Sequence, residues 1–139
     1  MAQSIREVRT ADPRTVESSA TVADAARAMR DGDVGSVVVV ENGAVAGIVT
    51  DRDIAVRVVA EGLDPDATRV SEVATMRPVT LTVDQSVDDA IRLVREQDVR
   101  RIIVLQDDRA AGIVSLGDLA IERDTDSALA DIASEPPNN

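Results

Sequence analysis

The feature that most constrains this chain is an internal duplication, because residues 5–55 align with residues 70–120 without a gap. The matched residues recur in the same order and end in Ala-Gly-Ile-Val at 46–49 and again at 111–114. A match of this length indicates one structural unit written twice. With 139 residues, the chain is long enough for two such units to bury a stable interior.

Each copy predicts a strand followed by a helix. The strands are expected near 14–16 and 79–83, and the second alternates apolar and polar residues. Each helix begins at a hydroxyl residue, Thr21 or Ser86, with an aspartate three residues later, which is a capping signature. Apolar residues then recur at i, i+3, i+4 and i+7: Val22, Ala25, Ala26 and Met29 in the first copy, and Val87, Ala90, Ile91 and Val94 in the second. Each helix therefore has one apolar face to bury.

A hairpin and a second helix complete the predicted unit. In the first copy, strands at 37–40 and 45–49 flank Asn42-Gly43, a pair that tolerates the positive φ angles of a tight turn. In the second copy, strands at 102–105 and 110–114 flank Asp107-Asp108. The helices that follow are expected to direct Ile54, Val58 and Leu119 inward. The predicted unit is β-α-β-β-α, and the fold class is α/β (α+β) with two such units.

The duplication also sets the predicted boundaries. We expect the first unit at 1–62, a connection at 63–69, the second unit at 70–123 and a tail at 124–139. Glu61-Gly62 and Pro65 supply a helix stop and a turn, so the connection is expected to be short and structured. The tail contains one weak helical segment at 127–132, and its end is expected to be disordered.

Composition excludes several classes of function. The net charge of −11 opposes binding to nucleic acids and to anionic membranes, so neither is an expected partner. All fifteen basic residues are Arg, which leaves Arg as the only cation for a phosphate. The chain has no His and no Cys, which excludes Ser-His and Cys-His nucleophilic sites, His- or thiolate-ligated metals and disulfides. The sequence therefore predicts neither an enzyme nor a metal site.

Two further absences narrow the expectations. There is no Phe, Tyr or Trp, so a bound base would have to lie between aliphatic side chains. No stretch approaches the roughly 20 apolar residues that cross a bilayer, and the N-terminus lacks the apolar core of a signal peptide. A cytoplasmic location is expected on this basis.

The most specific motif occurs once in each copy, as GIVTDRDI at 47–54 and GIVSLGDL at 112–119. Both read Gly, two aliphatic residues, a hydroxyl residue, two free positions and Asp. One interpretation is a helix cap only, in which the hydroxyl accepts a backbone N–H and the acid lies at the positive end of the helix dipole. The other is a ligand site, in which a carboxylate accepts the two hydroxyls of a ribose and the hydroxyl residue binds a phosphate. The motif alone leaves both open.

The order and spacing of these motifs resemble a tandem pair of cystathionine-β-synthase (CBS) domains, often called a Bateman module. The resemblance covers residues 5 to about 123, and short stand-alone bacterial CBS-pair proteins share phrases such as GIVTDRDI and VRR before a strand. It implies two units packed with pseudo-twofold symmetry, a homodimer, and a non-catalytic sensor of an adenosyl ligand. AMP, ADP, ATP and S-adenosylmethionine are the ligands implied, with no required cofactor, and the regulated protein is unidentified.

The resemblance also implies two clefts between the units. The first would combine these residues: Ile48, Thr50, Asp53, Arg100 and Arg101. The second would combine another set: Ile113, Ser115, Asp118, Gly35 and Ser36. In the first cleft the aspartate would take the ribose, the isoleucine the base and the arginines the phosphates, whereas the second cleft has no matching cation.

Two alternatives remain at this stage. The arginine pair could instead be surface charges that pair with the many acids of the chain. The whole protein could be a structural or stress-associated dimer that binds no nucleotide, with the motif residues acting only as helix caps.

Overall fold

The computed structural model describes residues 4–122, which form two compact units. The first-repeat unit comprises residues 13–78. The second-repeat unit comprises residues 4–12 together with 79–122. The predicted tail and its helical segment at 127–132 lie outside the described residues.

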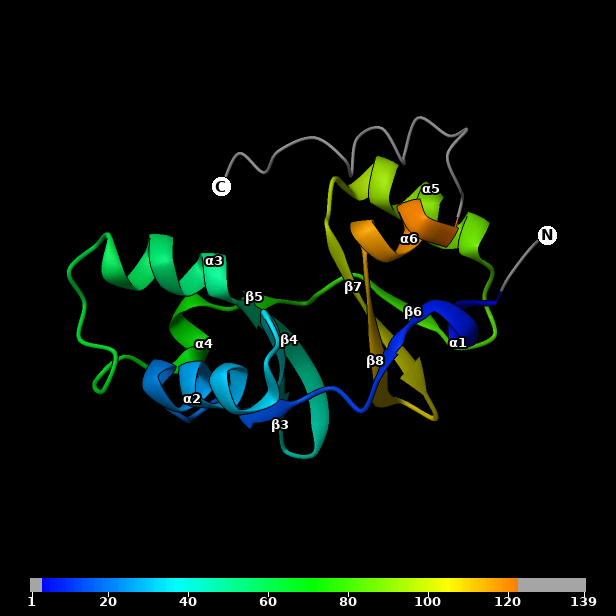
Figure 1. Cartoon of the computed structure of the whole chain (residues 1–139). Coiled ribbons are helices and arrows are strands. Elements are labelled where there is room, and N and C mark those ends of the chain that lie inside the picture. The colour runs from blue at the N-terminus through cyan, green and yellow to red at the C-terminus, as the bar shows by residue number, and fades with distance from the viewer. Residues whose placement is uncertain (1–3, 123–139) are drawn as a thin grey trace. The chain divides into compact units, whose positions relative to one another are not determined.

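The first-repeat unit is a four-stranded sheet with helices packed against one of its faces (Figure 1). Its strands are in the order β2-β3-β4-β5, in which β2 and β3 are parallel and the other pairs are antiparallel. Its elements follow one another as β2 (Thr15–Glu17), α2 (Val22–Gly32), β3 (Ser36–Glu41), β4 (Ala44–Thr50), α3 (Asp51–Ile54), η1 (Ala55–Val59), α4 (Val70–Val73) and β5 (Thr75–Met76).

The second-repeat unit has the same plan. Its sheet has the order β6-β7-β8-β1, again with one parallel pair, β6 with β7, and two antiparallel pairs. Its elements are α1 (Ile5–Val8), β1 (Thr10–Ala11), β6 (Thr80–Thr82), α5 (Val87–Gln97), β7 (Arg101–Gln106), β8 (Arg109–Ser115) and α6 (Leu116–Glu122). The predicted mixed α/β fold with two β-α-β-β-α units is confirmed, and a short leading helix and strand are added to each.

These leading segments pack on the opposite repeat. Ile5 is fully buried among residues of the second repeat, including Leu81 and Leu119, and β1 pairs with β8. Figure 1 shows α1 and β1, in blue, among the yellow and orange elements of this unit. Val70, which begins the second repeat, is fully buried with Val22 in the first-repeat unit. The two compact units thus divide the chain differently from the predicted boundaries. Those boundaries stay a prediction.

The short edge strands β5 and β1, which each sheet receives from the opposite repeat, explain the glycine of each GIV motif. A Cβ atom on Gly47 would lie 2.6 Å from the carbonyl oxygen of Thr75 in β5. A Cβ atom on Gly112 would lie 2.8 Å from the carbonyl oxygen of Thr10 in β1. A side chain at either position would push the short edge strand away, so the motif needs glycine for close strand approach.

The predicted caps and turns are confirmed. The Thr21 and Ser86 side chains accept hydrogen bonds from the backbone N–H groups of Asp24 and Asp89, so α2 and α5 begin where predicted. In the first hairpin Asn42 and Gly43 have φ angles of 53° and 80°. The second hairpin makes the same turn with two aspartates, which tolerate positive φ better than most side chains do.

The helix after the first motif differs from a regular α-helix. It changes at Ala55 into a π-helical turn, in which the N–H of Ala60 donates to the carbonyl of Ala55 over 2.9 Å. The π-helical turn ends at Val59, and the turn that follows it ends at Gly62, whose φ of 71° lies in the left-handed region. The connection is structured as predicted, because the carbonyls of Thr68 and Pro65 accept the first N–H groups of α2.

The cores are entirely aliphatic. Val37, Val39 and Val49 face the helices of the first-repeat unit, and Val58 from η1 is fully buried with them. Ile54 packs against this cluster, and Leu119 is fully buried in the second-repeat unit, so the predicted inward positions are confirmed. Among residues 4–122, no helix is long and apolar enough to cross a membrane.

Candidate ligand-binding site

The first motif forms a complete capping box at the junction of β4 and α3. The Thr50 hydroxyl oxygen accepts from the Asp53 N–H over 3.0 Å, and Asp53 Oδ2 accepts from the Thr50 N–H over 2.9 Å. Thr50 itself has extended backbone geometry, as a residue preceding a helix should. The capping interpretation of the motif is therefore confirmed here.

The second motif makes the same box at the junction of β8 and α6. The Ser115 hydroxyl oxygen accepts from the Asp118 N–H, and Asp118 Oδ2 accepts from the Ser115 N–H, both over 3.1 Å. Both side chains are partly buried. The duplicated sequence has kept the same local hydrogen bonds at both junctions.

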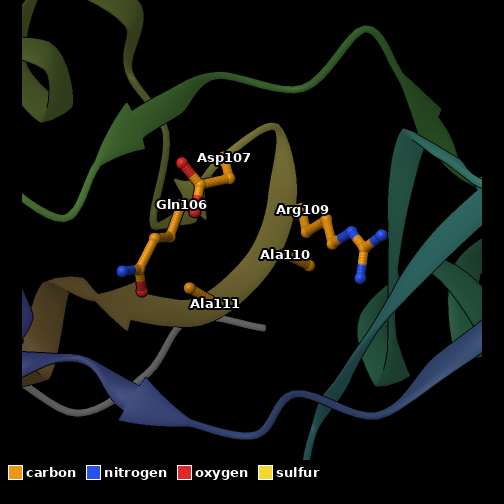
Figure 2. Close-up of a pocket in the computed structure, with 5 residues that line it drawn as sticks. All are labelled: Gln106, Asp107, Arg109, Ala110 and Ala111. Carbon is orange, nitrogen blue, oxygen red and sulfur yellow. The ribbon is translucent and has the colours of Figure 1, made fainter.

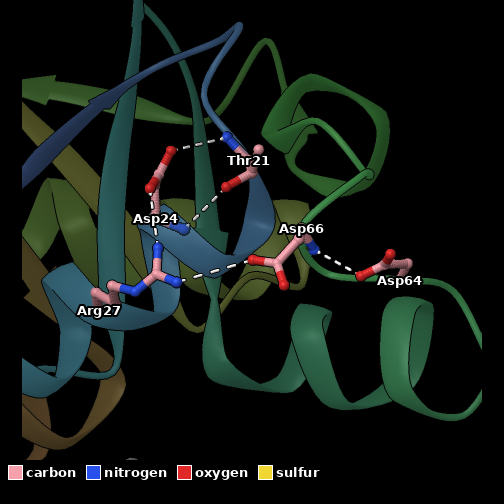
Figure 3. Close-up of polar contacts among 5 residues, drawn as sticks. All are labelled: Thr21, Asp24, Arg27, Asp64 and Asp66. Carbon is pink, nitrogen blue, oxygen red and sulfur yellow. Dashed lines mark hydrogen bonds and ion pairs between the residues drawn. The ribbon is translucent and has the colours of Figure 1, made fainter.

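A comparison with the plain cap at Thr21 shows which hydrogen-bonding capacity of Asp53 remains unused. At Thr21, Asp24 uses one carboxylate oxygen for the cap and the other for Arg27, 3.1 Å away, while Arg27 also reaches Asp66 at 3.7 Å (Figure 3). Asp66 is held in turn by its own N–H, which donates to Asp64 over 2.9 Å (Figure 3). This cap is a solvent-facing ion-pair network.

The Asp53 cap is more enclosed and less fully used. Its side chain is 14% exposed, against 52% for Asp24. Its free oxygen, Oδ1, lies 3.9 Å from Nε of Arg57, a weak contact, because the Arg57 guanidinium donates a 2.9 Å hydrogen bond to the carbonyl of Val73. Asp53 therefore retains an acceptor oxygen, and the Thr50 hydroxyl retains its proton for a further acceptor.

Several predicted residues share one face of the first sheet. Thr50 pairs with Ser36 across the strands, and Ile48 pairs with Val38. By strand alternation these four lie on the face opposite to Val49 and the helices. Ser36 and Ile48 are both buried, and the Asp51 N–H donates to the carbonyl of Gly35 over 3.0 Å. The structure thus brings Gly35 and Ser36 beside the first motif.

The second sheet presents the same face with one change of chemistry. Ser115 pairs with Arg101, and Ile113 pairs with Ile103. The Leu116 N–H donates to the carbonyl of Arg100 over 2.8 Å. Arg101 therefore stands where the first sheet has Ser36, and within a unit the arginines lie beside the second motif. The pairing of Asp53 with Arg100 and Arg101, and of Asp118 with Gly35 and Ser36, stays a prediction.

Sequence reasoning had missed Val38 and Ile103 as members of these two faces. Both are fully buried, and both follow a residue that packs against the helices. Applying strand alternation to VVVV and IIVL would have found them, since each lies two positions after Ser36 or Arg101.

Two carboxyl groups on the long helices have a lowered pKa. Hydrogen bonding from the Ser86 backbone N–H lowers the pKa of Asp89, and hydrogen bonding from Arg30 lowers the pKa of Asp31. Neither residue belongs to the predicted site. Within residues 4–122, no three carboxylates gather in a group that could hold a metal ion.

One cavity of about 540 Å³ lies away from the motifs, at the β7–β8 hairpin (Figure 2). It is lined by Gln106, Asp107, Arg109, Ala110 and Ala111. These residues surround the turn of the hairpin, whereas Arg101 and Ser115 lie at the opposite ends of its strands. This cavity therefore contains none of the predicted site residues.

Comparison with known families decides the relationship. The family described as CBS domain matches residues 5–60 and 70–123. This chain belongs to the CBS domain family. It carries two copies of the domain, and proteins built from such pairs are generally regulatory modules without catalysis of their own.

Relatives of this CBS pair cover most of its length. The CBS domain-containing protein YhcV of Bacillus subtilis is 38% identical over 86% of this chain and 85% of its own. The crystal structure of Hypoxic Response Protein I with two coordinated zinc ions is 29% identical with a TM-score of 0.74, over 88% of this chain and 99% of that chain. The hexameric CBS-CP12 protein from bloom-forming cyanobacteria is 32% identical with a TM-score of 0.79, over 88% of this chain and 72% of that chain.

Proposed function

We propose that this CBS pair is a cytoplasmic, non-catalytic regulatory module, a Bateman module, that binds an adenosyl ligand of the AMP, ADP or ATP class. The ligand would be held by Thr50 and Asp53, with Arg100 and Arg101 on its phosphates. The observation that carries the proposal is the enclosed carboxylate of Asp53, which completes a cap with one oxygen and keeps the other as an acceptor. A cap alone requires no such enclosure.

The chemistry of these groups suits a nucleoside. A ribose diol donates hydrogen bonds to a carboxylate, and such charge-assisted bonds are stronger than neutral ones. The Thr50 hydroxyl can donate to a ribose or phosphate oxygen, since its own oxygen already accepts the Asp53 N–H. Ile48, two residues before Thr50 on the same strand face, would contact the base, because the chain has no aromatic ring for stacking.

The two motifs are proposed to differ in ligand preference. Arg100 and Arg101 would clamp phosphates at the Asp53 position. The second position, with Ile113, Ser115, Asp118, Gly35 and Ser36, has no cation and would suit an uncharged or cationic adenosyl group such as that of S-adenosylmethionine. The net charge of −11 further favours AMP over the more highly charged ATP.

Regulation would follow from linkage. A ligand shifts a conformational equilibrium only by its differential affinity for the two states. Binding at Asp53 would therefore change the shape or rigidity that an unidentified regulated protein recognises. We also propose that the module works as a homodimer, which is supported by the hexameric assembly named for its CBS-CP12 relative.

The binding experiment compares two aspartate-to-asparagine variants. Asp53→Asn keeps an oxygen that can accept the Thr50 N–H but removes the charge, and Asp24→Asn makes the same change at the plain cap. Thermal melting is followed by circular dichroism, because the chain has no Trp or Tyr. AMP at 100 times its dissociation constant adds about 2.7 kcal/mol to the wild type, a shift on the order of 5 °C.

Asp53→Asn should weaken AMP binding by about tenfold or more, since a hydrogen bond to a charged group contributes about 1.5–3 kcal/mol. Asp24→Asn and Asp118→Asn should retain the AMP-induced shift. Equal losses in Asp53→Asn and Asp118→Asn would contradict the assignment of phosphorylated ligands to the first motif.

A structural or stress-associated dimer without a nucleotide is the second candidate. It is supported by the name of the Mycobacterium tuberculosis relative, Hypoxic response protein 1, which is 30% identical over 83% of this chain. It is also supported by the motif caps, which are complete without a ligand. If AMP, ADP, ATP and S-adenosylmethionine all leave the melting temperature unchanged, this second function replaces the first.

A further inference from the structure

Arg57 of η1 has two acceptors within reach and is bonded to one of them. Its Nη1 donates a 2.9 Å hydrogen bond to the carbonyl of Val73. Its Nε lies 3.9 Å from Oδ1 of Asp53, which is within ion-pair range but too long for a hydrogen bond. The guanidinium is therefore shared unequally between a carboxylate of the candidate ligand site and a carbonyl of α4.

The carbonyl of Val73 needs a donor from outside its own helix. It lies at the end of α4, which has four residues, and the last carbonyls of a helix have no partner within it. Because Val73 is buried, water is largely excluded from this residue, and Arg57 supplies the donor. This hydrogen bond ties η1 to α4, although α4 begins the second repeat.

The Arg57 bond is one of several that hold α4 on the first-repeat unit. The Val70 N–H donates to the carbonyl of Ala20 over 2.8 Å, and the Ser71 N–H donates to the carbonyl of Ser18 over 3.2 Å. Along the chain, α4 leads into β5 and then to Pro78, after which the chain passes into the second-repeat unit. A change in the docking of α4 would therefore reach the segment by which the chain leaves the first-repeat unit.

The second repeat has no arginine at the matching position. The repeat alignment places Glu122 opposite Arg57 and Val8 opposite Val73. Glutamate has no donor for a carbonyl when it is ionised, and it carries the same charge as the motif aspartate. The arrangement around Arg57 is therefore specific to the first motif, where the phosphorylated ligand is proposed to bind.

We propose that Arg57 is a positioning residue that couples ligand binding at Asp53 to the docking of α4. In the absence of ligand, the charge on Asp53 draws the guanidinium away from Val73. A ribose diol that donates to Oδ1 offsets part of this charge, so Arg57 bonds more strongly to the Val73 carbonyl and α4 is held more tightly. The inference rests on the proposed function for the identity of the ligand, and it adds the route by which binding reaches α4.

The first test needs no ligand, because neutralising Asp53 should have the same effect on Arg57. The N–H groups of Val70, Ser71 and Ala74, called the α4 amides below, report the docking of this helix. Asp53→Asn keeps the size of the side chain and removes its charge, so it should slow hydrogen exchange of the α4 amides by about threefold, the scale of an exposed ion pair. Exchange is measured by NMR on the full-length chain. If the carboxylate only capped α3 and steadied Arg57, its loss would speed exchange instead.

Removing the arginine should abolish this effect. Arg57→Met keeps the length of the side chain but has no donor, so it should speed exchange of the α4 amides by about fivefold or more. In the Arg57→Met background, Asp53→Asn should change their exchange by less than about 1.5-fold, because no guanidinium is left to share. Arg92→Met, which removes the same charge from an exposed ion pair on α5, should leave their exchange unchanged.

The second motif supplies a matched control. Asp118→Asn makes the same change in a capping box with the same hydrogen bonds, but in a repeat whose sequence has no arginine at the matching position. The N–H groups of Ile5, Arg6 and Arg9 on α1 make the hydrogen bonds that match those of the α4 amides. Asp118→Asn should not slow their exchange.

An AMP titration then tests the coupling itself. Saturating AMP should slow exchange of the α4 amides in the wild type by about threefold, and because coupling is reciprocal, the docked helix should raise AMP affinity by the same factor. Arg57→Met should therefore weaken AMP binding by only about threefold, as measured by isothermal titration calorimetry. At saturating AMP, this variant should show no slowing of the α4 amides.

The outcomes separate this inference from the proposed function. Asp53→Asn that speeds exchange of the α4 amides or leaves it unchanged would overturn the sharing of Arg57. AMP that binds the wild type without slowing these amides would overturn the coupling and leave the proposed function standing. If AMP does not bind, the proposed function fails, while the ligand-free comparison of Asp53→Asn with and without Arg57 still decides whether the arginine is shared.

Discussion

At the first motif junction the cross-strand partner of Thr50 is Ser36, whereas at the second junction the partner of Ser115 is Arg101. The backbones around these pairs make the same caps and the same hydrogen bond from the start of the motif helix. The duplicated scaffold is therefore fixed by glycine, cap and core positions. The side chains on the sheet face that those positions do not occupy can differ between the two repeats.

The largest expected effect comes from truncating the buried side chains of the two leading segments that pack on the opposite repeat. Ile5 and Val70 occupy matching positions, and both are fully buried. Ile5→Ala should lower the free energy of unfolding by about 3 kcal/mol, and Val70→Ala by about 2 kcal/mol, since each leaves a cavity. Urea unfolding measures these changes.

Hydrogen exchange locates them. Ile5→Ala should speed exchange in β7 and β8, although Ile5 begins the first repeat in the chain, and Val70→Ala should speed exchange in β3 and β4. Faster exchange of β3 and β4 in Ile5→Ala would contradict the exchanged packing of the leading segments.

A smaller effect tests the difference between Ser36 and Arg101 at the two motif junctions. Arg101→Ser gives the second repeat a hydroxyl residue like Ser36 of the first. If Arg101 binds phosphate, AMP affinity should fall about tenfold, the loss expected for one charged hydrogen bond, while adenosine affinity stays within about twofold. Isothermal titration calorimetry measures both.

Arg95→Ser, which changes the net charge equally on exposed α5, serves as the control. Equal weakening of AMP by Arg101→Ser and Arg95→Ser would identify the Arg101 contribution as a general charge effect.

The smallest effect concerns the caps of the long helices. Because the Ser86 N–H lowers the pKa of Asp89, the folded state favours the ionised carboxylate. This stabilisation is present above the unfolded pKa of about 3.8 and is lost as the pH falls through the lower folded value. Asp89→Asn cannot titrate, so its melting temperature should fall less between pH 6 and pH 3 than that of the wild type. A larger fall would reverse the predicted sign.

Much of the fold could be predicted because its signals are local. The apolar stripes of α2 and α5, the hydroxyl caps and the Asn42-Gly43 turn each lie within a few residues. The duplication then doubled each signal, so a weak turn such as Asp107-Asp108 could be assigned from its partner in the first repeat.

The parts that escaped prediction depend on distant contacts. Helices α1 and α4 have four residues each, too few for a periodic pattern, and their packing partners lie far along the chain. The π-helical turn depends on one backbone hydrogen bond from Ala60 to Ala55, and no residue type in the sequence predicts that bond. At the candidate site, the motif predicted the cap, but only the structure revealed that Asp53 is enclosed and Asp24 is not.

The exchanged segments also bear on how the chain can be divided. Cutting it in the connection at 63–69 would leave an N-terminal piece without α4 and β5, and a C-terminal piece without α1 and β1. Each piece would hold the missing edge strand of the other, so the severed halves should complement one another as a nicked complex. Separately expressed repeats should instead expose unpaired sheet edges and aggregate.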